Sequence, residues 1–514
     1  MHMKPVMAAV ALLFLGTAAL AATPSNPMLF DSQLPAVPEP MNSPVPTIVE
    51  SKPAPGFLDL IARTGVPADQ LGSRRGEPKS FVPDEYNWAQ MGKDPAMTCY
   101  NPCIPTDTAS YIWKKQQTGS GWMPWGGYPV EADGYAVFFD HNPGNVTCYD
   151  ITDGTVVWSH LAGTQLYRGR YRPSQPAIFE HNSTSYVVAL GYQSGGKLIC
   201  WNLATGTEMW RTNITLSSSL GAYKAHPFYL NGYIYFDLHT ERGATVPFYK
   251  VDAGTGTATV LFTMSYESWG GACCDSSYIY VSEGRGGSAR VHKYDMSTGS
   301  EVATSPSQGS RLIETPPAYY NGRIFIAFQG KTCCFDASDM SLIWSKPITG
   351  TIDSQWIGVD QFAGGSVYVS PYGSSSTNYV YAFKQLDGSN TWTTDPYRFP
   401  HGQIYNGAIG VTGEPGDGHY LYATPGFYGT PPTSMYVIDA DSGTTVQYWS
   451  STGGEQMFSG LCRGNSYLLS KTGYGTLYCW KIPNDITVKE HDVGVSAILE
   501  PASRKLDPGT TFTP

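Results

Sequence analysis

The fold is decided by a repeated stretch that is clearest in Cys200-Trp201-Asn202-Leu203-Ala204-Thr205-Gly206-Thr207-Glu208-Met209-Trp210. Here an anchor residue, Asn202, is followed by a Gly four residues later and by a Trp eight residues later. Other units keep the Gly, the Trp or both at these distances from the anchor, and the last unit keeps neither. The anchors are Asp150, Asn202, Asp252, Asp295, Asp336, Lys384, Asp439 and Lys481. Their separations of 41–55 residues suit a propeller with one four-stranded blade per unit.

Strand and turn chemistry explains each unit. An alternating strand such as 197–201 precedes the anchor, whose side chain is expected to bond to the backbone of the turn. The Gly is expected to adopt a positive φ, and the strand after it carries the Trp. Upstream strands such as 232–237 and 322–328 bring the number per unit to four. The Asp, Gly and Trp are therefore predicted to specify the scaffold.

The strands that are missing at one end of the repeat region are present at the other end. The last unit supplies strands near 455–461, 466–470 and 476–481 but no Trp-bearing outer strand. Ser110-Tyr111-Ile112-Trp113-Lys114 is a Trp-bearing strand without the three strands that should precede it. We expect the two to pair, because closure removes the open sheet edge. The prediction is an all-β, eight-bladed propeller of four-stranded antiparallel blades, with seven blades as the alternative if Lys481 is not a true anchor.

Composition narrows the class of protein. Charged residues make up 14% of the 514, and 56 Gly and 35 Tyr suit short strands and tight turns. The net charge of −10, without a basic run, argues against a nucleic-acid partner. No run of consecutive apolar residues after the N-terminus approaches the length that a membrane span requires.

The flanking segments indicate export and a modular chain. Residues 1–21 have the basic start, apolar run and small-residue cleavage site of a signal peptide. Residues 22–108 are predicted to be a Pro-rich linker and irregular structure, and 109–482 the propeller. Residues 483–514 resemble a linker and the truncated start of an immunoglobulin-like module. The predicted location is extracellular or at the cell surface, with the periplasm as an alternative.

The repeat resembles the pyrroloquinoline-quinone-type repeat, whose hairpin reads aromatic, Ala, Leu, Asp, two variable residues, Thr-Gly and Trp. Residues 202–210 and 295–299 match it best. The resemblance implies a propeller over about 109–482. The family includes quinone-dependent alcohol dehydrogenases and also propellers without a cofactor, so it leaves both functions open.

Two vicinal cysteine pairs bear on this choice. Quinoprotein dehydrogenases have a vicinal disulfide that packs on the quinone, and Cys273-Cys274 is placed on a predicted innermost strand, so a vicinal disulfide there is one interpretation. Cys334 instead stands two residues before an anchor, where small buried packing residues are expected. Its equivalents are Cys148, Cys200 and Cys479. No haem-attachment motif and no calcium-binding carboxylate set was identified, so no metal site is predicted.

Ligands of propellers usually bind in the axial funnel, where inner strands and their loops meet. Candidate ligand-binding residues there are Trp125, Arg172, Gln175, Lys224, His226, Trp269, Glu314, Trp356, His401 and Asn406. For each of them a packing role is the alternative, and no catalytic residue was identified.

The favoured function is a non-catalytic binding or scaffold module for a protein or glycan, without a cofactor, as a monomeric propeller within a longer multidomain chain. The alternative is a dehydrogenase of alcohols or sugars that uses pyrroloquinoline quinone and calcium.

Overall fold

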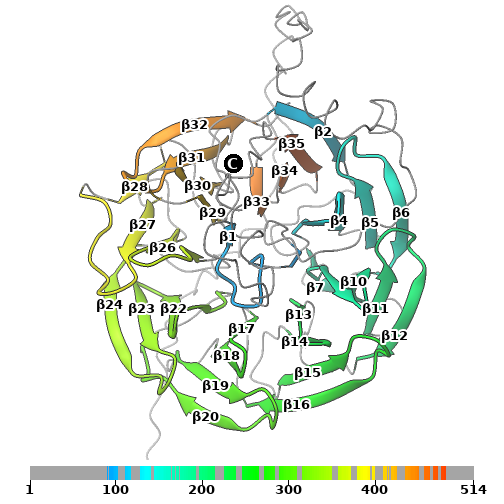
Figure 1. The fold of residues 1–514 in the computed structure, drawn as a ribbon, viewed down its shortest axis with the longest axis horizontal. Coiled ribbons are helices and arrows are strands. Elements are labelled where there is room, and N and C mark those ends of the chain that lie inside the picture. Colours follow the sequence, from blue (N-terminus) through cyan, green and yellow to red (C-terminus); the bar gives the residue numbers. More distant parts are fainter. Residues whose placement is uncertain are drawn as a thin grey trace, which may run out of the picture. The chain divides into compact units, whose positions relative to one another are not determined.

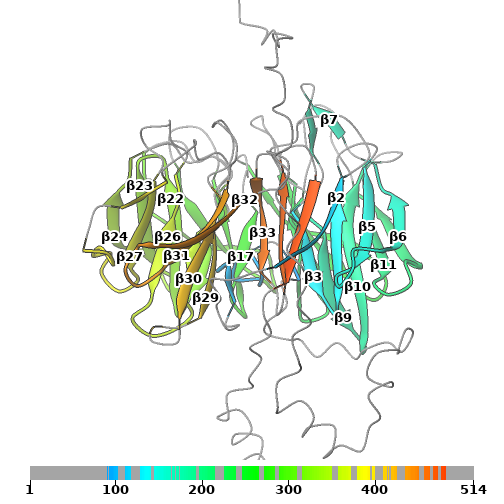
Figure 2. The ribbon, with the colours of Figure 1, turned by 90° about the horizontal axis from the view of Figure 1, so that it is seen from above.

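A computed structural model describes residues 89–90, 92–101 and most of 110–481, with short gaps mainly at loops. The chain divides into two units, residues 1–77 and 78–514, and all described residues belong to the second. Within it, eight antiparallel sheets are arranged in a ring (Figure 1). Seen from the side, the strands run across the thickness of the ring (Figure 2).

Each of the first four blades consists of four consecutive strands. Blade one contains β3 (Val130–Ala132), β4 (Tyr135–Phe139), β5 (Asn145–Asp150) and β6 (Val156–Leu161). Blade two contains β9 (Ala177–His181), β10 (Thr184–Gly191), β11 (Lys197–Asn202) and β12 (Glu208–Asn213). Blade three contains β13 (Phe228–Leu230), β14 (Tyr233–Asp237), β15 (Val246–Asp252) and β16 (Ala258–Met264). Blade four contains β17 (Ala272–Cys274), β18 (Tyr278–Ser282), β19 (Val291–Asp295) and β20 (Glu301–Thr304).

Blades five and six also consist of consecutive strands, whereas blades seven and eight each include one strand from the N-terminal part of the chain. Blade five contains β21 (Ala318–Tyr320), β22 (Arg323–Phe328), β23 (Lys331–Asp336) and β24 (Leu342–Pro347). Blade six contains β25 (Gly358–Val359), β26 (Ser366–Val369), β27 (Tyr379–Lys384) and β28 (Tyr397–Arg398). Blade seven contains β29 (Ile409–Gly413), β30 (His419–Ala423), β31 (Ser434–Asp439) and β32 (Thr445–Ser450), with β1 (Tyr100–Asn101) added inside. Blade eight contains β33 (Met457–Arg463), β34 (Tyr467–Thr472), β35 (Thr476–Lys481) and β2 (Ser110–Gln116). A separate hairpin, β7 (Gln165–Tyr167) with β8 (Arg170–Arg172), connects blades one and two.

The predicted closure of the ring is confirmed. β2 pairs antiparallel with β35, and Trp113 lies opposite Cys479 across the two strands. Lys481 ends β35 at the position that the other anchors occupy, so eight blades are present. In blade six the outer strand differs from the prediction, because Trp392 lies in a bend between the isolated bridge at Asn390 and the short β28.

The anchors act within their own hairpins, as their local spacing predicted. Asp252 Oδ1 accepts the backbone N–H of Thr255 at 2.8 Å, and Asn202 Oδ1 accepts that of Thr205 at 2.9 Å. Gly206 has φ 70° and Gly256 has φ 72°, a conformation that only Gly adopts without strain.

Five Trp residues of the outer hairpins join their blades to the next ones. Each indole N–H donates to the carbonyl of the residue that follows the next anchor. The pairs are Trp113 with Ile151 (2.8 Å), Trp158 with Leu203 (2.7 Å), Trp210 with Ala253 (2.9 Å), Trp344 with Gln385 (3.0 Å) and Trp392 with Ala440 (2.9 Å). The repeat therefore encodes both a hairpin and the seam between neighbouring blades.

Blade four lacks this Trp and has Ala303 in its place. The equivalent carbonyl in blade five, that of Ala337, instead accepts the Lys293 ammonium at 2.7 Å. Ser338 O accepts the same ammonium at 3.0 Å. Met340, which replaces the repeat Gly of blade five, is fully buried with φ 63°. The loss of the Trp is thus accompanied by changes on both sides of this seam.

Two glycines with nearly the same φ differ in how closely neighbouring atoms surround them, so Ala substitutions at the two positions distinguish backbone strain from steric crowding. Gly299 and Gly322 have φ of 72° and 74°, but a Cβ on Gly299 would lie 2.0 Å from Leu261 O of blade three, while a Cβ on Gly322 would meet nothing within 4 Å. We expect Gly322→Ala to cost about 1 kcal/mol from backbone strain. Gly299→Ala should cost about 1–3 kcal/mol more, because a backbone carbonyl must move. Urea midpoints at constant slope measure both changes, and equal losses would contradict the crowded seam.

Candidate functional site on the propeller axis

Residues 89–90 and 92–101, the axial segment, lie inside the ring (Figure 1). The sequence predicted irregular structure there and did not predict its place on the axis. The segment bonds in turn to the innermost strands of blades two to seven. The donors and acceptors are Ile178 N with Ala89 O (2.6 Å), Tyr229 N with Gln90 Oε1 (3.3 Å), Cys274 N with Pro95 O (2.8 Å), Tyr319 N with Ala96 O (2.8 Å), Val359 N with Thr98 O (2.8 Å) and Val411 N with Cys99 O (2.9 Å).

These hydrogen bonds explain why the axial segment adopts a single path. The innermost strand of each blade has one edge that no strand of its own sheet covers, and buried backbone N–H groups require an acceptor. The carbonyls of the segment supply it for five blades, and a Gln90 side-chain oxygen supplies it for blade three. In blade seven the segment becomes β1, parallel to β29, with Tyr100 opposite Val411. The segment thereby covers the axial edges of six blades.

A tight local conformation allows the axial segment to follow the curve of the ring. Lys93, Met97 and Cys99 have positive φ, at 74°, 59° and 53°, and Gly92 has φ 65°. Asp94 stabilises the turn, because Oδ2 accepts the Thr98 hydroxyl at 2.7 Å. Non-Gly residues in the left-handed region are uncommon and cluster where the surrounding structure imposes them.

The axial segment is also attached by side chains. The Gln361 amide, from the turn after β25, donates to Asp94 Oδ2 at 2.8 Å and to Thr98 Oγ1 at 2.6 Å. The Tyr100 hydroxyl donates to Gly413 O at 3.3 Å, and its ring meets Phe362 edge-on at 6.4 Å between centroids. Blades six and seven therefore hold the end of the segment most extensively.

Of the predicted funnel residues, Gln175 has a structural role. Its side-chain N–H donates to Tyr128 O at 2.8 Å, and its side-chain oxygen accepts Tyr128 N–H at 2.9 Å. Its own backbone N–H donates to Ala225 O at 3.0 Å. Gln175 thus ties together the segments that lead into blades one, two and three, which is the packing alternative considered from the sequence.

The other funnel residues are placed only in part. His226 is buried just before β13, beside Gly271, and Arg172 ends β8. The structure therefore places Gln175 and His226 at the entrances to adjacent blades. Outside the described residues lie Trp125, Lys224, Trp269, Glu314, Trp356, His401 and Asn406.

Cys273 and Cys274 lie on β17, the innermost strand of blade four, as predicted. Both are free thiols, 0% and 3% exposed, and they belong to different hydrophobic clusters because adjacent strand residues point to opposite faces. Burial raises the pKa of both thiols, with a smaller contribution from Asp275 to each. They are therefore protonated and weakly nucleophilic at neutral pH.

The described residues do not fit a quinone packed against a Cys273-Cys274 disulfide. The two sulfur atoms face separate cores, and the axial segment bonds to the backbone of Cys274 at the inner edge of β17. Among the residues that the structure describes, no group of three His, Cys, Asp or Glu side chains is placed to hold a metal ion. No helix in the described part of the chain has the length and apolarity needed to cross a membrane.

The fold and the axial site together define an eight-bladed propeller whose own N-terminal segment lines the axis and closes the last blade. The family model described as outer membrane protein assembly factor BamB matches residues 99–305 and 287–402, more than half of the chain. The chain therefore belongs to this family of repeat propellers. No curated protein matches the chain.

Solved structures share this fold at low sequence identity. A europium-containing methanol dehydrogenase has a TM-score of 0.58 at 12% identity, covering 78% of this chain and 98% of its own. Quinohemoprotein alcohol dehydrogenase ADHIIG from Pseudomonas putida HK5 has a TM-score of 0.55 at 12% identity, covering 78% and 81%. BamB from Moraxella catarrhalis has a TM-score of 0.49 at 14% identity, covering 73% and 100%.

Proposed function

We propose that the protein is a non-catalytic propeller that acts outside the cytoplasm as a binding scaffold for another protein or a glycan. One observation carries the non-catalytic part: the axial segment occupies the inner edges of blades two to seven. That region is where a quinone and its vicinal disulfide would otherwise meet. The signal-peptide features of residues 1–21 and the family description support a location outside the cytoplasm.

Exposed apolar side chains on the outer strands support a macromolecular partner. Outer strands leave an unpaired edge, and proteins usually place charges there. Here several blades expose apolar residues beside charged ones, and such surfaces mark interaction sites when they gather. They are Tyr111, Val156, Val157, Leu161, Met209, Val260, Val302, Leu342, Ile343, Val446 and Tyr448.

Reconstitution tests this proposal directly. The purified protein is incubated with pyrroloquinoline quinone and Ca²⁺ and passed through a desalting column, and quinone absorbance is measured in the protein fraction. We expect no retained quinone and no dye reduction with alcohols or sugars. Stoichiometric quinone uptake with Ca²⁺-dependent dye reduction would establish the dehydrogenase instead.

The binding part has a separate test. Glycan arrays and protein capture are performed with the natural chain and with Val156→Ser/Leu161→Ser, which removes exposed apolar area from β6 alone. We expect a specific ligand to be retained by the natural chain and depleted by the variant if blade one takes part. The paired change Val446→Ser/Tyr448→Ser on β32 is the matched control on another blade. Ligands that bind all three proteins equally are assigned to other surfaces.

A further inference from the structure

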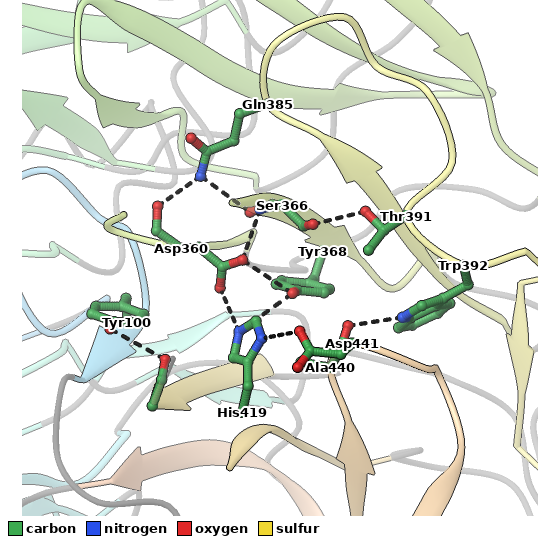
Figure 3. A network of polar contacts seen from close by, with 11 residues as sticks. Tyr100, Asp360, Ser366, Tyr368, Gln385, Thr391, Trp392, His419, Ala440 and Asp441 are labelled. Atoms are coloured by element: carbon green, nitrogen blue, oxygen red, sulfur yellow. Dashed lines mark hydrogen bonds and ion pairs between the residues drawn. The ribbon is translucent and has the colours of Figure 1, made fainter. Parts of the chain in front are cut away.

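A charge cluster with a buried His-Asp pair joins blades six and seven (Figure 3). Asp360 follows β25 in blade six, His419 begins β30 in blade seven, and Asp441 lies in the turn between β31 and β32. His419 Nε2 lies 2.9 Å from Asp360 Oδ1, and His419 Nδ1 lies 2.9 Å from Asp441 Oδ1. The imidazole is therefore held between two carboxylates from different blades.

This geometry fixes the protonation of His419. A neutral imidazole has one N–H and one lone pair, whereas the imidazolium donates from both nitrogens. Both nitrogens of His419 face a carboxylate oxygen at hydrogen-bond distance, so only the imidazolium satisfies both contacts. Burial lowers the pKa of His419, but the hydrogen bonds and charges of Asp360 and Asp441 outweigh it and raise the pKa above its usual value.

The two carboxylates differ in what else satisfies them. Asp360 is fully buried, and its Oδ2 also accepts the backbone N–H of Ser366 at 2.7 Å and the hydroxyl of Tyr368 at 3.1 Å. Burial and Asp360 raise the pKa of Tyr368 well above its usual value, so that hydroxyl remains a donor. The side chain of Asp441 is 48% exposed and can be solvated by water.

Other groups around His419 do not replace this pairing. Phe362 and Tyr368 meet the imidazole edge-on, with centroids 5.4 and 6.2 Å away. Asp94 of the axial segment accepts a hydrogen bond from Gln361, which follows Asp360 in the chain, and it adds a negative charge near the cluster. Among the described residues, His419 is the cation that pairs with both carboxylates, so its imidazolium is the positive charge that Asp360 and Asp441 share.

We propose that Asp360, His419 and Asp441 form a pH-sensitive latch, which closes the seam between blades six and seven when His419 is protonated and releases Asp441 when it is neutral. The buried Asp360 retains the remaining N–H, because an unpaired carboxylate there is costly, whereas Asp441 can turn to water. Ala440, next to Asp441, supplies the carbonyl that accepts the Trp392 indole and donates its own N–H to His419 O. Release of Asp441 therefore loosens the seam at Ala440.

The direction of the pH dependence follows from linkage. A His whose pKa is higher in the folded state contributes its full stabilisation below the unfolded pKa of about 6.5. That stabilisation is lost as the pH rises through the folded pKa of His419. The latch is thus closed in mildly acidic solution and opens toward alkaline pH.

Hydrogen exchange of the full chain, corrected for the intrinsic effect of pH, tests the latch. Between about pH 6 and pH 9, we expect protection of peptides covering 436–445 to fall about tenfold or more, the change that one pKa unit represents. Peptides covering 94–101 and 360–366 should keep their protection, because Asp360 retains its partners. Histidine-selective ¹⁵N labelling should show both His419 nitrogens protonated at pH 6.

Two variants and one control separate the latch from general destabilisation. His419→Gln should give low protection at 436–445 at both pH values, because an amide cannot donate to both carboxylates. Asp441→Asn, which changes a half-exposed residue, should lower the midpoint of the pH profile by about one unit. His292→Gln is the matched control, since His292 contacts Glu301 within blade four at 3.0 Å, and it should leave the profile unchanged. An unaltered midpoint in Asp441→Asn, or flat protection in the natural chain, would overturn the proposal.

Discussion

A chain that begins at residue 117 is expected to lose its cooperative unfolding transition. It lacks β2, so β35 is left with an unpaired edge, and blade eight loses the Trp113 bond to Ile151 O of blade one. Loss of a buried Trp side chain alone costs about 3–5 kcal/mol, which is comparable with a total stability of about 5–15 kcal/mol. Exposed strand edges also promote association. Circular dichroism during heating and size-exclusion chromatography measure both effects.

Two longer chains serve as controls for this truncation. A chain from residue 78, the start of the second unit, retains all the described residues and should melt as the full chain does. A chain from residue 110 keeps β2 but lacks the axial segment, and it should be intermediate, because six innermost strands lose their added acceptors. Equal melting temperatures of the chains from 117 and 78 would show that β2 does not stabilise the ring.

The scaffold could be predicted because its determinants act over short distances in the sequence. The six Asp and Asn anchors bond through their side chains to backbone N–H groups two or three residues away, as Asp295 does with Thr298 N at 2.8 Å. The glycine that follows has the same φ in hairpin after hairpin, and closure followed from counting strands at the two ends. Regular repetition made each of these features visible several times.

The axial segment could not be predicted by the same means. Its hydrogen bonds connect backbone atoms to strands far away in the sequence, such as Thr98 O to Val359 N, and backbone groups leave no residue pattern. Gly92 and Asp94 were the available signals, since they suit a tight turn, but neither identifies the partner strands.

The histidine latch was missed for a related reason. Asp360 follows β25, His419 begins β30 and Asp441 lies in the turn after β31, without a fixed spacing, and the sequence drew attention to His401 and His226 instead. Only the tertiary arrangement of blades six and seven brings the three side chains together.

Trp158→Ala is expected to destabilise the protein by about 4 kcal/mol, within the range observed for buried aromatic truncations. Trp158 is buried, donates to Leu203 O at 2.7 Å and stacks with His160 at 5.4 Å between centroids. A Cβ placed on Gly206 would lie 2.5 Å from the Trp158 ring, so the ring and the turn of blade two are in direct contact. Truncation therefore removes the main apolar contact and a hydrogen bond of one seam, and guanidinium unfolding measures the loss.

Two further variants separate the contribution of the indole hydrogen bond from that of the buried ring. Trp158→Phe keeps a ring and removes the indole N–H, so it should cost about 1 kcal/mol for the hydrogen bond in addition to a smaller loss of volume. Trp210→Ala changes the equivalent residue of blade two, which is more exposed but donates to Ala253 O in the same way. It should cost less than Trp158→Ala, because burial rather than the shared hydrogen bond sets most of the difference. Equal losses at the two positions would mean that the bond to the next blade dominates each seam.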